Sequence, residues 1–401
     1  MFFDFRHRLL GILDRADSLL SKALAQRRSL FGANNQKEVA ASLTSLGLLR
    51  SDQAKFDDAE RLVRQALKTD RANLPPADPA IAIATQALGK VLEDRGSYKE
   101  AIEVFKEAVR LRSSAGADKA DLAASQIELA NTYFYNNQYD EAESLYRALL
   151  PTYRRLFGER HPMVAEDLIN LGAIQQQRGR FKEAEAFHRQ ALEIMLAFYG
   201  KDHYKTADSL TLVARALEYQ NRYDEAVGML QRALAIQEKV FGSVHPNVAS
   251  ALNELGNIAV RRGQYDEAEA GFKRILEIYR ACYQGKHYRI GIALANLGGV
   301  YLARKDNVRA EQLFRQALAM YAQTLPAGNL DEGITRIKLG RALLRQNRFA
   351  DAHVQSLAGY QIVSIRQSST VTYLVNARQD LAEEAGKMNG LPVTVAVSHQ
   401  H

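Results

Sequence analysis

Cysteine, proline and long apolar runs are scarce in this 401-residue chain, and each shortage excludes a class of protein. The single cysteine, Cys282, rules out an intramolecular disulfide and any metal site built from several cysteines. No stretch reaches the roughly 18 consecutive apolar residues that a bilayer-spanning helix needs. Charged residues within 4–17 interrupt any secretory core region. We therefore expect a soluble, cytoplasmic protein that does not contact a membrane.

The abundant residue types favour helices and a stacked architecture. Ala, Leu, Glu, Arg and Gln dominate, and most of the eight prolines lie between periodic segments rather than inside them. A chain of 401 residues exceeds the roughly 250 to 300 residues of a single core, so it must form domains or a one-dimensional stack. The 53 basic and 46 acidic residues nearly balance, so charge alone does not indicate nucleic acid.

A small residue after Leu or Val recurs along the chain, with steps of 42 residues and one step of 41. It stands at Gly47, Gly89, Ala130, Gly172, Ala214, Gly256, Gly298 and Gly340. Twelve residues after each comes an alanine, at Ala59, Ala101, Ala142, Ala184, Ala226, Ala268, Ala310 and Ala352. An aromatic precedes this alanine by three residues in seven of the eight units, Asn307 being the exception. Turn-forming pairs such as Asn137-Gln138 lie between the two marks.

The pattern predicts two antiparallel helices per unit, joined by a short turn. Small residues on both helices allow the backbones to approach closely, and we expect the aromatic at the turn to fill the wedge beside them. On the second helix Ala268, Phe272 and Ile275 are spaced i, i+4 and i+7, which places them on one buried face.

The order Leu-Gly, then Tyr-Asp-Glu-Ala, then Phe and Ala resembles the tetratricopeptide repeat. With its 42-residue period and linkers at 157–162 and 241–246, the chain is similar to the kinesin light chain type of this repeat over about residues 12–386. The resemblance implies an all-α, right-handed superhelical solenoid of about eight helix-turn-helix repeats. Its first helices would line a concave groove for peptides or partner proteins. Local departures from the pattern stand at Thr85, His188, Asn307, Arg336 and Ser356.

We expect the ends of such a stack to be capped. Residues 17–31 resemble a lone second helix with too few residues before it for a partner, and residues 371–385 a ninth first helix with a polar outer face at Asn376, Arg378, Gln379, Glu383 and Glu384. The predicted division is 1–36 for an N-terminal half repeat, 37–77, 78–118, 119–160, 161–202, 203–244, 245–286, 287–328 and 329–369 for the repeats, 370–388 for a capping helix and 389–401 for a flexible tail.

Four histidines recur in the loops between units, at His161, His203, His245 and His287. Neighbouring helices lie roughly 8 to 10 Å apart, whereas zinc needs its ligands within about 2 Å of one point. We therefore expect no metal and assign the histidines to helix starts, as Asp78 and Asp331 at equivalent places suggest. No catalytic motif or phosphate loop occurs, Cys282 is interpreted as structural, and we expect no enzyme activity and no cofactor.

Polar residues beside the Gly or Ala mark of the first helices are the candidate peptide-binding groove. They are Asn131, Asn170, Arg215, Tyr219, Asn253, Asn257, Arg261, Asn296, Arg341 and Arg345. Amide side chains suit a peptide main chain, and arginine adds recognition of carboxylate or phosphate. The pair Asn257 and Asn296 resembles the asparagines of tetratricopeptide domains that grip a carboxylate tail. Asn253 replaces the lysine expected there, so an extended acidic or mixed peptide is the broader prediction.

The leading hypothesis is a non-enzymatic adaptor that binds a peptide or partner protein, with family context suggesting bacterial signalling. RNA binding is the second hypothesis, weakened because Glu166, Asp208 and Glu218 break a continuous phosphate track. Self-association through Phe2, Phe3 and Phe5 is the third.

Overall fold

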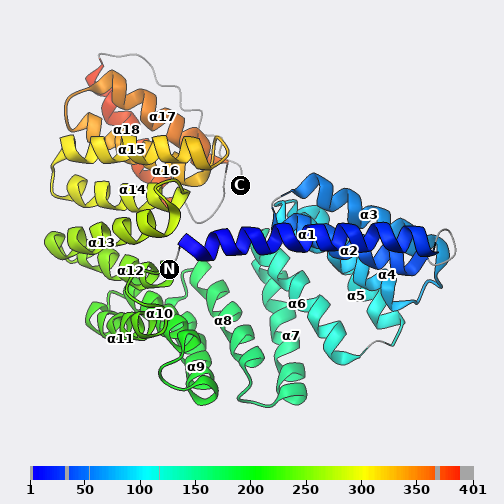
Figure 1. Ribbon diagram of the computed structural model, residues 1–401. Coiled ribbons are helices and arrows are strands. Elements are labelled where there is room, and N and C mark those ends of the chain that lie inside the picture. The colour runs from blue at the N-terminus through cyan, green and yellow to red at the C-terminus, as the bar shows by residue number, and fades with distance from the viewer. Residues whose placement is uncertain (1–2, 32–35, 54, 117, 366–370, 389–401) are drawn as a thin grey trace. The chain divides into compact units, whose positions relative to one another are not determined.

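The computed structural model describes residues 3–31, 36–53, 55–116, 118–365 and 371–388, and their regular elements are all α-helices (Figure 1). The chain divides into two compact units, one of residues 1–178 with 186–198 and one of residues 179–185 with 199–401. The division passes through α9 (Phe181–Tyr199), whose first turn belongs to the second unit. No helix in the described ranges is long and apolar enough to cross a membrane.

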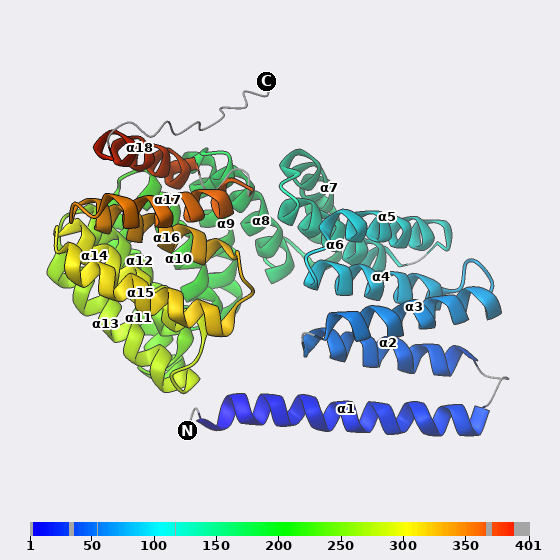
Figure 2. The ribbon, with the colours of Figure 1, turned by 90° about the horizontal axis from the view of Figure 1, so that it is seen from above.

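In the first unit, helices that follow one another in sequence pack against one another (Figure 2). Besides most of α9, it contains α1 (Phe3–Phe31), α2 (Gln36–Asp52), α3 (Phe56–Asn73), α4 (Pro79–Asp94), α5 (Tyr98–Ser114), α6 (Lys119–Tyr135), α7 (Tyr139–Phe157) and α8 (Pro162–Gln177). Helices α2, α4 and α6 are first helices, each packed on its second helix α3, α5 or α7. Each second helix in turn contacts the next first helix.

The second unit repeats this arrangement. It contains α10 (Tyr204–Tyr219), α11 (Tyr223–Phe241), α12 (Pro246–Arg261), α13 (Tyr265–Tyr283), α14 (Tyr288–Ala303), α15 (Asn307–Thr324), α16 (Leu330–Leu344), α17 (Phe349–Ser364) and α18 (Val371–Lys387). Its first helices are α10, α12, α14 and α16, and α18 packs on both helices of the last pair. The all-α class and the helix-turn-helix repeats predicted from the sequence are confirmed.

The two helices of a pair approach closely where a ring of the second helix packs on a glycine of the first helix. A Cβ atom placed on Gly89 would lie 2.8 Å from Phe105, and one on Gly256 would lie 2.8 Å from Phe272. Ala268, Phe272 and Ile275 are buried, as their spacing predicts. The expectation that the turn aromatic fills this wedge is wrong, because the ring four residues after the alanine occupies it.

The aromatics at the turns are half-buried and stabilise the turn instead. The hydroxyl of Tyr139 donates to Asn137 Oδ1 at 2.9 Å, and that of Tyr223 donates to Asn221 Oδ1 at 2.7 Å. Both asparagines have positive φ, 61° and 60°, a conformation that asparagine tolerates better than most residues. The predicted turn at Asn137-Gln138 is therefore confirmed, with a specific role for the tyrosine.

The N-terminal helix differs from the prediction. Helix α1 begins at Phe3 instead of residue 17 and continues without a break for 29 residues. In its second half Leu24 is buried in a cluster with Val39 and Leu43 of α2. Phe3 and Phe5 therefore belong to α1 itself, whereas Phe2 lies outside the described residues.

The C-terminal helix α18 covers the last repeat with an unexpectedly polar inner face. Ala377 and Leu381 are buried, but so are Asp380 and Glu384. Glu384 Oε1 accepts a hydrogen bond from the Ser356 hydroxyl at 2.7 Å. The assignment of Glu384 to the outer face is therefore wrong. Ser356 stands where Phe105, Phe272 and Phe314 stand in other repeats; the α17 backbone lies close to Gly340, and the Ser356 hydroxyl bonds the buried carboxylate. The predicted tail 389–401 lies outside the described residues.

Candidate functional site

The loop histidines position the first helices. The Nδ1 atoms of His161, His203, His245 and His287 accept the backbone N–H two residues later, at 3.1 to 3.3 Å. Each imidazole also stacks on the aromatic that ends the preceding second helix, as His287 does on Tyr283 with ring centroids 3.9 Å apart. The predicted helix-start role is confirmed for these histidines and for Asp78. For Asp331 it is wrong, because Asn329 is the N-cap of α16 and Asp331 lies in the first turn.

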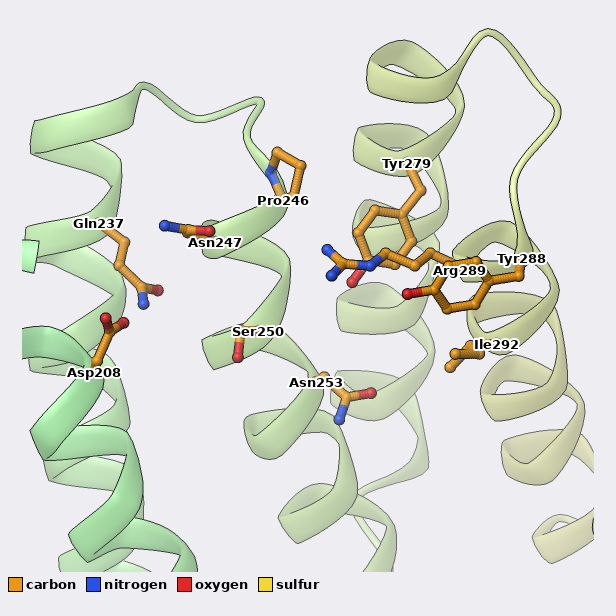
Figure 3. A pocket seen from close by; sticks show the side chains of 10 residues that line it. All are labelled: Asp208, Gln237, Pro246, Asn247, Ser250, Asn253, Tyr279, Tyr288, Arg289 and Ile292. Atoms are coloured by element: carbon orange, nitrogen blue, oxygen red, sulfur yellow. The ribbon is translucent and has the colours of Figure 1, made fainter. Parts of the chain in front are cut away.

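A hollow of about 490 Å³ lies along α12 in the second unit and is called the α12 pocket here. Side chains from five helices line it (Figure 3). They are Asp208 of α10, Gln237 of α11, Pro246, Asn247, Ser250 and Asn253 of α12, Tyr279 of α13, and Tyr288, Arg289 and Ile292 of α14. Asp208 and Gln237 lie on one side, and Tyr279, Tyr288 and Arg289 lie on the other.

The α10–α11 side of the pocket presents hydrogen-bond acceptors. Gln237 is only 2% exposed, and its amide group donates to the Asp208 carboxylate. Its Oε1 atom is buried and has no hydrogen-bond partner among the described residues. Partial desolvation raises the pKa of Asp208, and the nearby Lys205 and the Gln237 amide counteract this rise. This side therefore favours a ligand that donates hydrogen bonds or carries positive charge.

The α13–α14 side presents donors. Arg289 is half-buried, and its guanidinium donates to the Tyr283 hydroxyl at 3.3 Å and also bonds Tyr288. No carboxylate forms an ion pair with Arg289 in the part of the chain that the structure describes. Burial raises the pKa of Tyr279, so its hydroxyl keeps its proton at neutral pH. This side therefore favours a carboxylate or another anion.

The hollow exists because two positions of the repeat carry smaller or more polar side chains here. Gln237 stands where Tyr153, Tyr279 and Tyr321 stand in other second helices. Ser250 stands where the next two first helices carry Ile292 and Ile334. The departures leave space beside α12 and replace apolar surface by polar groups. Departures from a repeat pattern were thus the sequence signal for this site, and the initial prediction missed Gln237, Tyr279, Tyr288 and Arg289.

The predicted groove arginines are already paired with acids from neighbouring first helices or from α18. Arg215 bonds Glu254 at 2.8 Å, and Arg261 bonds Glu218 at 2.9 Å. Arg341 makes two contacts to Asp380, the shorter of 2.9 Å, and Arg345 bonds Glu383 at 2.9 Å. Each partner lies 38 to 43 residues away in the sequence. These arginines therefore stabilise the contacts between repeats and offer less free positive charge than their number suggests.

The predicted groove amides and the tyrosine have mixed environments. Asn253 lines the α12 pocket and accepts a hydrogen bond from Asn296 at 2.9 Å, whereas Asn131 accepts from the Tyr146 hydroxyl at 2.6 Å. Tyr219 is 43% exposed and stacks on Phe181 with ring centroids 4.7 Å apart. Asn170 and Asn257 are half-buried on α8 and α12. Of the ten predicted residues, the structure thus places Asn253 in the pocket.

The single cysteine lies outside the pocket. Cys282 is half-buried near the end of α13, and its sulfur lies 3.9 Å from the carbonyl oxygen of Val244. Burial raises the pKa of the Cys282 thiol. A raised pKa reduces the thiolate fraction and therefore the reactivity of the cysteine.

Comparison with known proteins gives a consistent family assignment. A family model described as a tetratricopeptide repeat matches residues 80–155, 121–197, 168–239 and 247–323, and a second with the same description matches residues 212–281. Protein KINESIN LIGHT CHAIN-RELATED 1 from Arabidopsis thaliana is 24% identical over 172 residues, which are 43% of this chain and 28% of that protein. KINESIN LIGHT CHAIN-RELATED 3 from the same plant matches to a similar extent, at 24% identity and over 26% of its length. The chain therefore spans about a quarter of these relatives.

Solved structures extend the likeness over most of the chain. The apo form of the quorum sensor NprR from B. thuringiensis matches with a TM-score of 0.64 at 13% identity, covering 90% of this chain and 100% of that one. A Rap protein complexed with Competence and Sporulation Factor matches with a TM-score of 0.52 at 15% identity, covering 87% of this chain and 99% of that one. At these identities the likeness concerns the helical-repeat fold.

Proposed function

This chain belongs to the tetratricopeptide repeat family, and from that premise we propose that it is a non-enzymatic scaffold that binds a peptide or partner protein on its first helices. The observation that carries the proposal is the α12 pocket, whose lining includes a buried amide oxygen without a hydrogen-bond partner and an arginine without an acidic partner among the described residues. Burying such groups without partners costs free energy, which a ligand that bonds them returns. Main-chain and side-chain amides of a peptide supply both donors and acceptors.

The surface around the pocket is preformed. Ala251, Leu252, Ala293 and Leu294 hold α12 and α14 in the core and are buried. Histidine N-caps His245 and His287 fix the starts of the same helices. A surface built on rigid helices loses little conformational entropy on binding, which leaves more of the interaction energy for affinity.

We place this scaffold in bacterial signalling and in the cytoplasm. The structural neighbours support the first assignment, since one is described as a quorum sensor and another as complexed with Competence and Sporulation Factor. A single cysteine accords with a reducing compartment. The ion pairs of the groove arginines weigh against RNA as the ligand, because neutralised arginines attract phosphate poorly.

Affinity capture from a nuclease-treated native lysate tests the proposal. The groove variant carries Asn257→Ala and Arg261→Ala, and its matched control carries Gln231→Ala and Arg232→Ala on the exposed side of α11. Both remove one amide and one guanidinium, so the net charge changes equally. We expect a partner retained by the wild type and the control and lost by the groove variant. Equal retention by all three proteins would place binding away from the surface around Asn257 and Arg261.

A further inference from the structure

We propose that the α12 pocket selects a mixed-charge peptide segment, in which a basic side chain contacts Asp208 and Gln237 and an acidic side chain contacts Arg289. The inference rests on the proposed function and specifies its ligand. Three features carry it: a buried acceptor without a partner, an arginine without an acidic partner among the described residues, and their location on opposite sides of one hollow (Figure 3).

The acceptor side selects the basic group. Gln237 donates to Asp208 through its amide nitrogen, which leaves the buried Oε1 atom at the pocket wall without a hydrogen-bond partner among the described residues. The Asp208 carboxylate adds negative charge beside that oxygen. An ammonium or guanidinium group can bond both acceptors at once, whereas a neutral donor gains less because it lacks the charge-assisted bond. An acidic side chain would be repelled by Asp208.

The donor side selects the acidic group. Arg289 is held by the Tyr283 and Tyr288 side chains, neither of which neutralises its charge. Tyr279 adds a protonated hydroxyl at the same side of the pocket. A carboxylate can accept from the guanidinium and a hydroxyl together. This environment contrasts with Arg215 and Arg261, whose guanidinium groups already contact carboxylates.

The two sides set an approximate spacing between the ligand charges. Neighbouring packed helices are roughly 8 to 10 Å apart, so α10 and α14, with α12 between them, are separated by about 20 Å. Side chains of ligand and pocket cover part of this distance, and an extended peptide advances about 3.3 Å per residue. We therefore expect the two charged residues to be separated by about three intervening residues. The amide of Asn247 and the hydroxyl of Ser250 lie between the two sides, where they can bond the peptide main chain.

The test uses the full chain and four fluorescent peptides measured by fluorescence anisotropy. Their termini are blocked, and they share a Gly-Ser background with two variable positions separated by three residues. One carries Lys and Glu, one two Glu, one two Lys and one two Gln. We expect the Lys–Glu peptide to bind roughly tenfold or more tightly than the other three, because each charge-assisted hydrogen bond contributes substantially. Equal affinities, or no binding of the Lys–Glu peptide at millimolar concentration, would overturn the proposal.

Two variants replace a charged residue of the pocket by the uncharged residue that stands at the equivalent position of a neighbouring repeat. Asp208→Ser introduces the residue type of Ser250, and Arg289→Asn introduces that of Asn247. Each should weaken binding of the Lys–Glu peptide roughly tenfold while thermal unfolding changes little. Asp208→Lys should in addition transfer the preference to the peptide with two Glu residues. Unchanged preference in all three variants would contradict the assignment of the two sides.

A failure of this inference is distinguishable from a failure of the proposed function. If a captured partner depends on Asn257 and Arg261 but binds Asp208→Ser and Arg289→Asn like the wild type, the scaffold function stands and the pocket assignment is wrong. If the groove variant and the wild type capture the same proteins and the four peptides bind alike, both are wrong.

Discussion

Arginines on the first helices of the second unit have opposite environments at its pocket and at its C-terminal end. Arg341 and Arg345 contact Asp380 and Glu383 of α18, so the chain itself supplies their acidic partners. Arg289 has only tyrosine partners in the described part of the chain and lines an open hollow. The last repeat thus receives its acidic partners from α18, whereas Arg289 lines the pocket without an acidic partner among the described residues.

The second helices of these two regions also differ, at the residue that packs on the glycine of the first helix. At the pocket end Phe272 lies against Gly256, whereas at the C-terminal end Ser356 lies against Gly340 and receives Glu384 from α18. At Gly256 the second helix contributes a large ring, whereas at Gly340 it contributes a small serine whose hydroxyl bonds a carboxylate of another helix.

Truncating the ring should have the largest effect. Phe272→Ala should lower the free energy of unfolding by about 3 to 5 kcal/mol, because a fully packed ring leaves a cavity. Ser356→Ala at the equivalent position should cost about 1 kcal/mol, since it removes one hydrogen bond to Glu384. Urea denaturation followed by circular dichroism measures both. Similar losses of unfolding free energy in the two variants would contradict the proposed difference between the Phe272 and Ser356 positions.

Raising the pH should weaken the C-terminal end. Burial raises the pKa of Glu384 to about 7 from an ordinary value of 4.5. Repulsion by Asp380 and Glu383 also raises this pKa, whereas the hydrogen bond from Ser356 lowers it. The Nδ1 atom of His353 lies 3.4 Å from the Oε2 atom of Glu384. Because the folded pKa is the higher one, the stabilisation is complete below about pH 4.5 and is lost as the pH rises through 7. The loss should reach about 2 to 3 kcal/mol.

Hydrogen exchange of the α18 amides at pH 5 and pH 8 measures this effect after correction for intrinsic exchange rates. The control is Glu384→Gln, which should remove most of the difference between the two conditions. It also accounts for Asp167 of the first unit, whose pKa burial raises to about 8 and which titrates in both proteins. An equal pH dependence in the wild type and the variant would contradict the role of Glu384.

Removing one acid of the α18 contact should have a smaller effect. Asp380→Asn should lower the free energy of unfolding by about 1 to 2 kcal/mol, because it breaks an ion pair whose Asp380 side chain is only 4% exposed. The effect is limited because burial opposes the ionisation of Asp380 and because Arg341 keeps some contact with water. Glu383→Gln, at a pair that is more exposed, should cost less than about 1 kcal/mol. Denaturation at fixed pH compares them, and the reverse order of effects would contradict this description of the contact.

Filling the pocket should change the free energy of unfolding least, and the change should be an increase. Gln237→Tyr introduces the residue of Tyr279 and Tyr321 at the equivalent position. It should raise the free energy of unfolding by about 0.5 to 1 kcal/mol, because it buries apolar area and removes an unpaired amide oxygen. It should also abolish binding of the Lys–Glu peptide. A lower melting temperature would show that the hollow is not a vacant tyrosine position.

Much of the fold follows from local patterns along the chain. Gly256 and Ala268 predict the close pair α12 and α13, Asn137 predicts a turn, and His245 predicts a helix start. Each inference needs only contacts within one repeat, and the periodicity supplies independent copies of the same pattern. The errors lie where a repeat departs from its copies: Glu384 was expected on the outer face of the last helix, but it is buried and accepts a hydrogen bond from Ser356.

The candidate site was harder to predict from the sequence than the fold. Position on a first helix was sufficient to select Arg215, Arg261, Arg341 and Arg345, but not to show that each already has an acidic partner. Arg289 was overlooked because it lies at the start of its helix, away from the Gly mark. Gln237 was overlooked because a glutamine on a second helix suggests a solvated surface, whereas its side chain is 2% exposed.

The class of fold, the helix pairs and the spacing of the repeats follow from the amino-acid sequence, because these features depend on side-chain size and backbone preference over short distances. Tertiary structure alone decided which polar groups are paired and which remain available. Partners such as Arg215 and Glu254, or Arg341 and Asp380, lie 39 residues apart and meet only through the packing of neighbouring helices. The physical reason is that a charge is neutralised by proximity in space, and a repeat pattern specifies proximity within a unit more closely than between units.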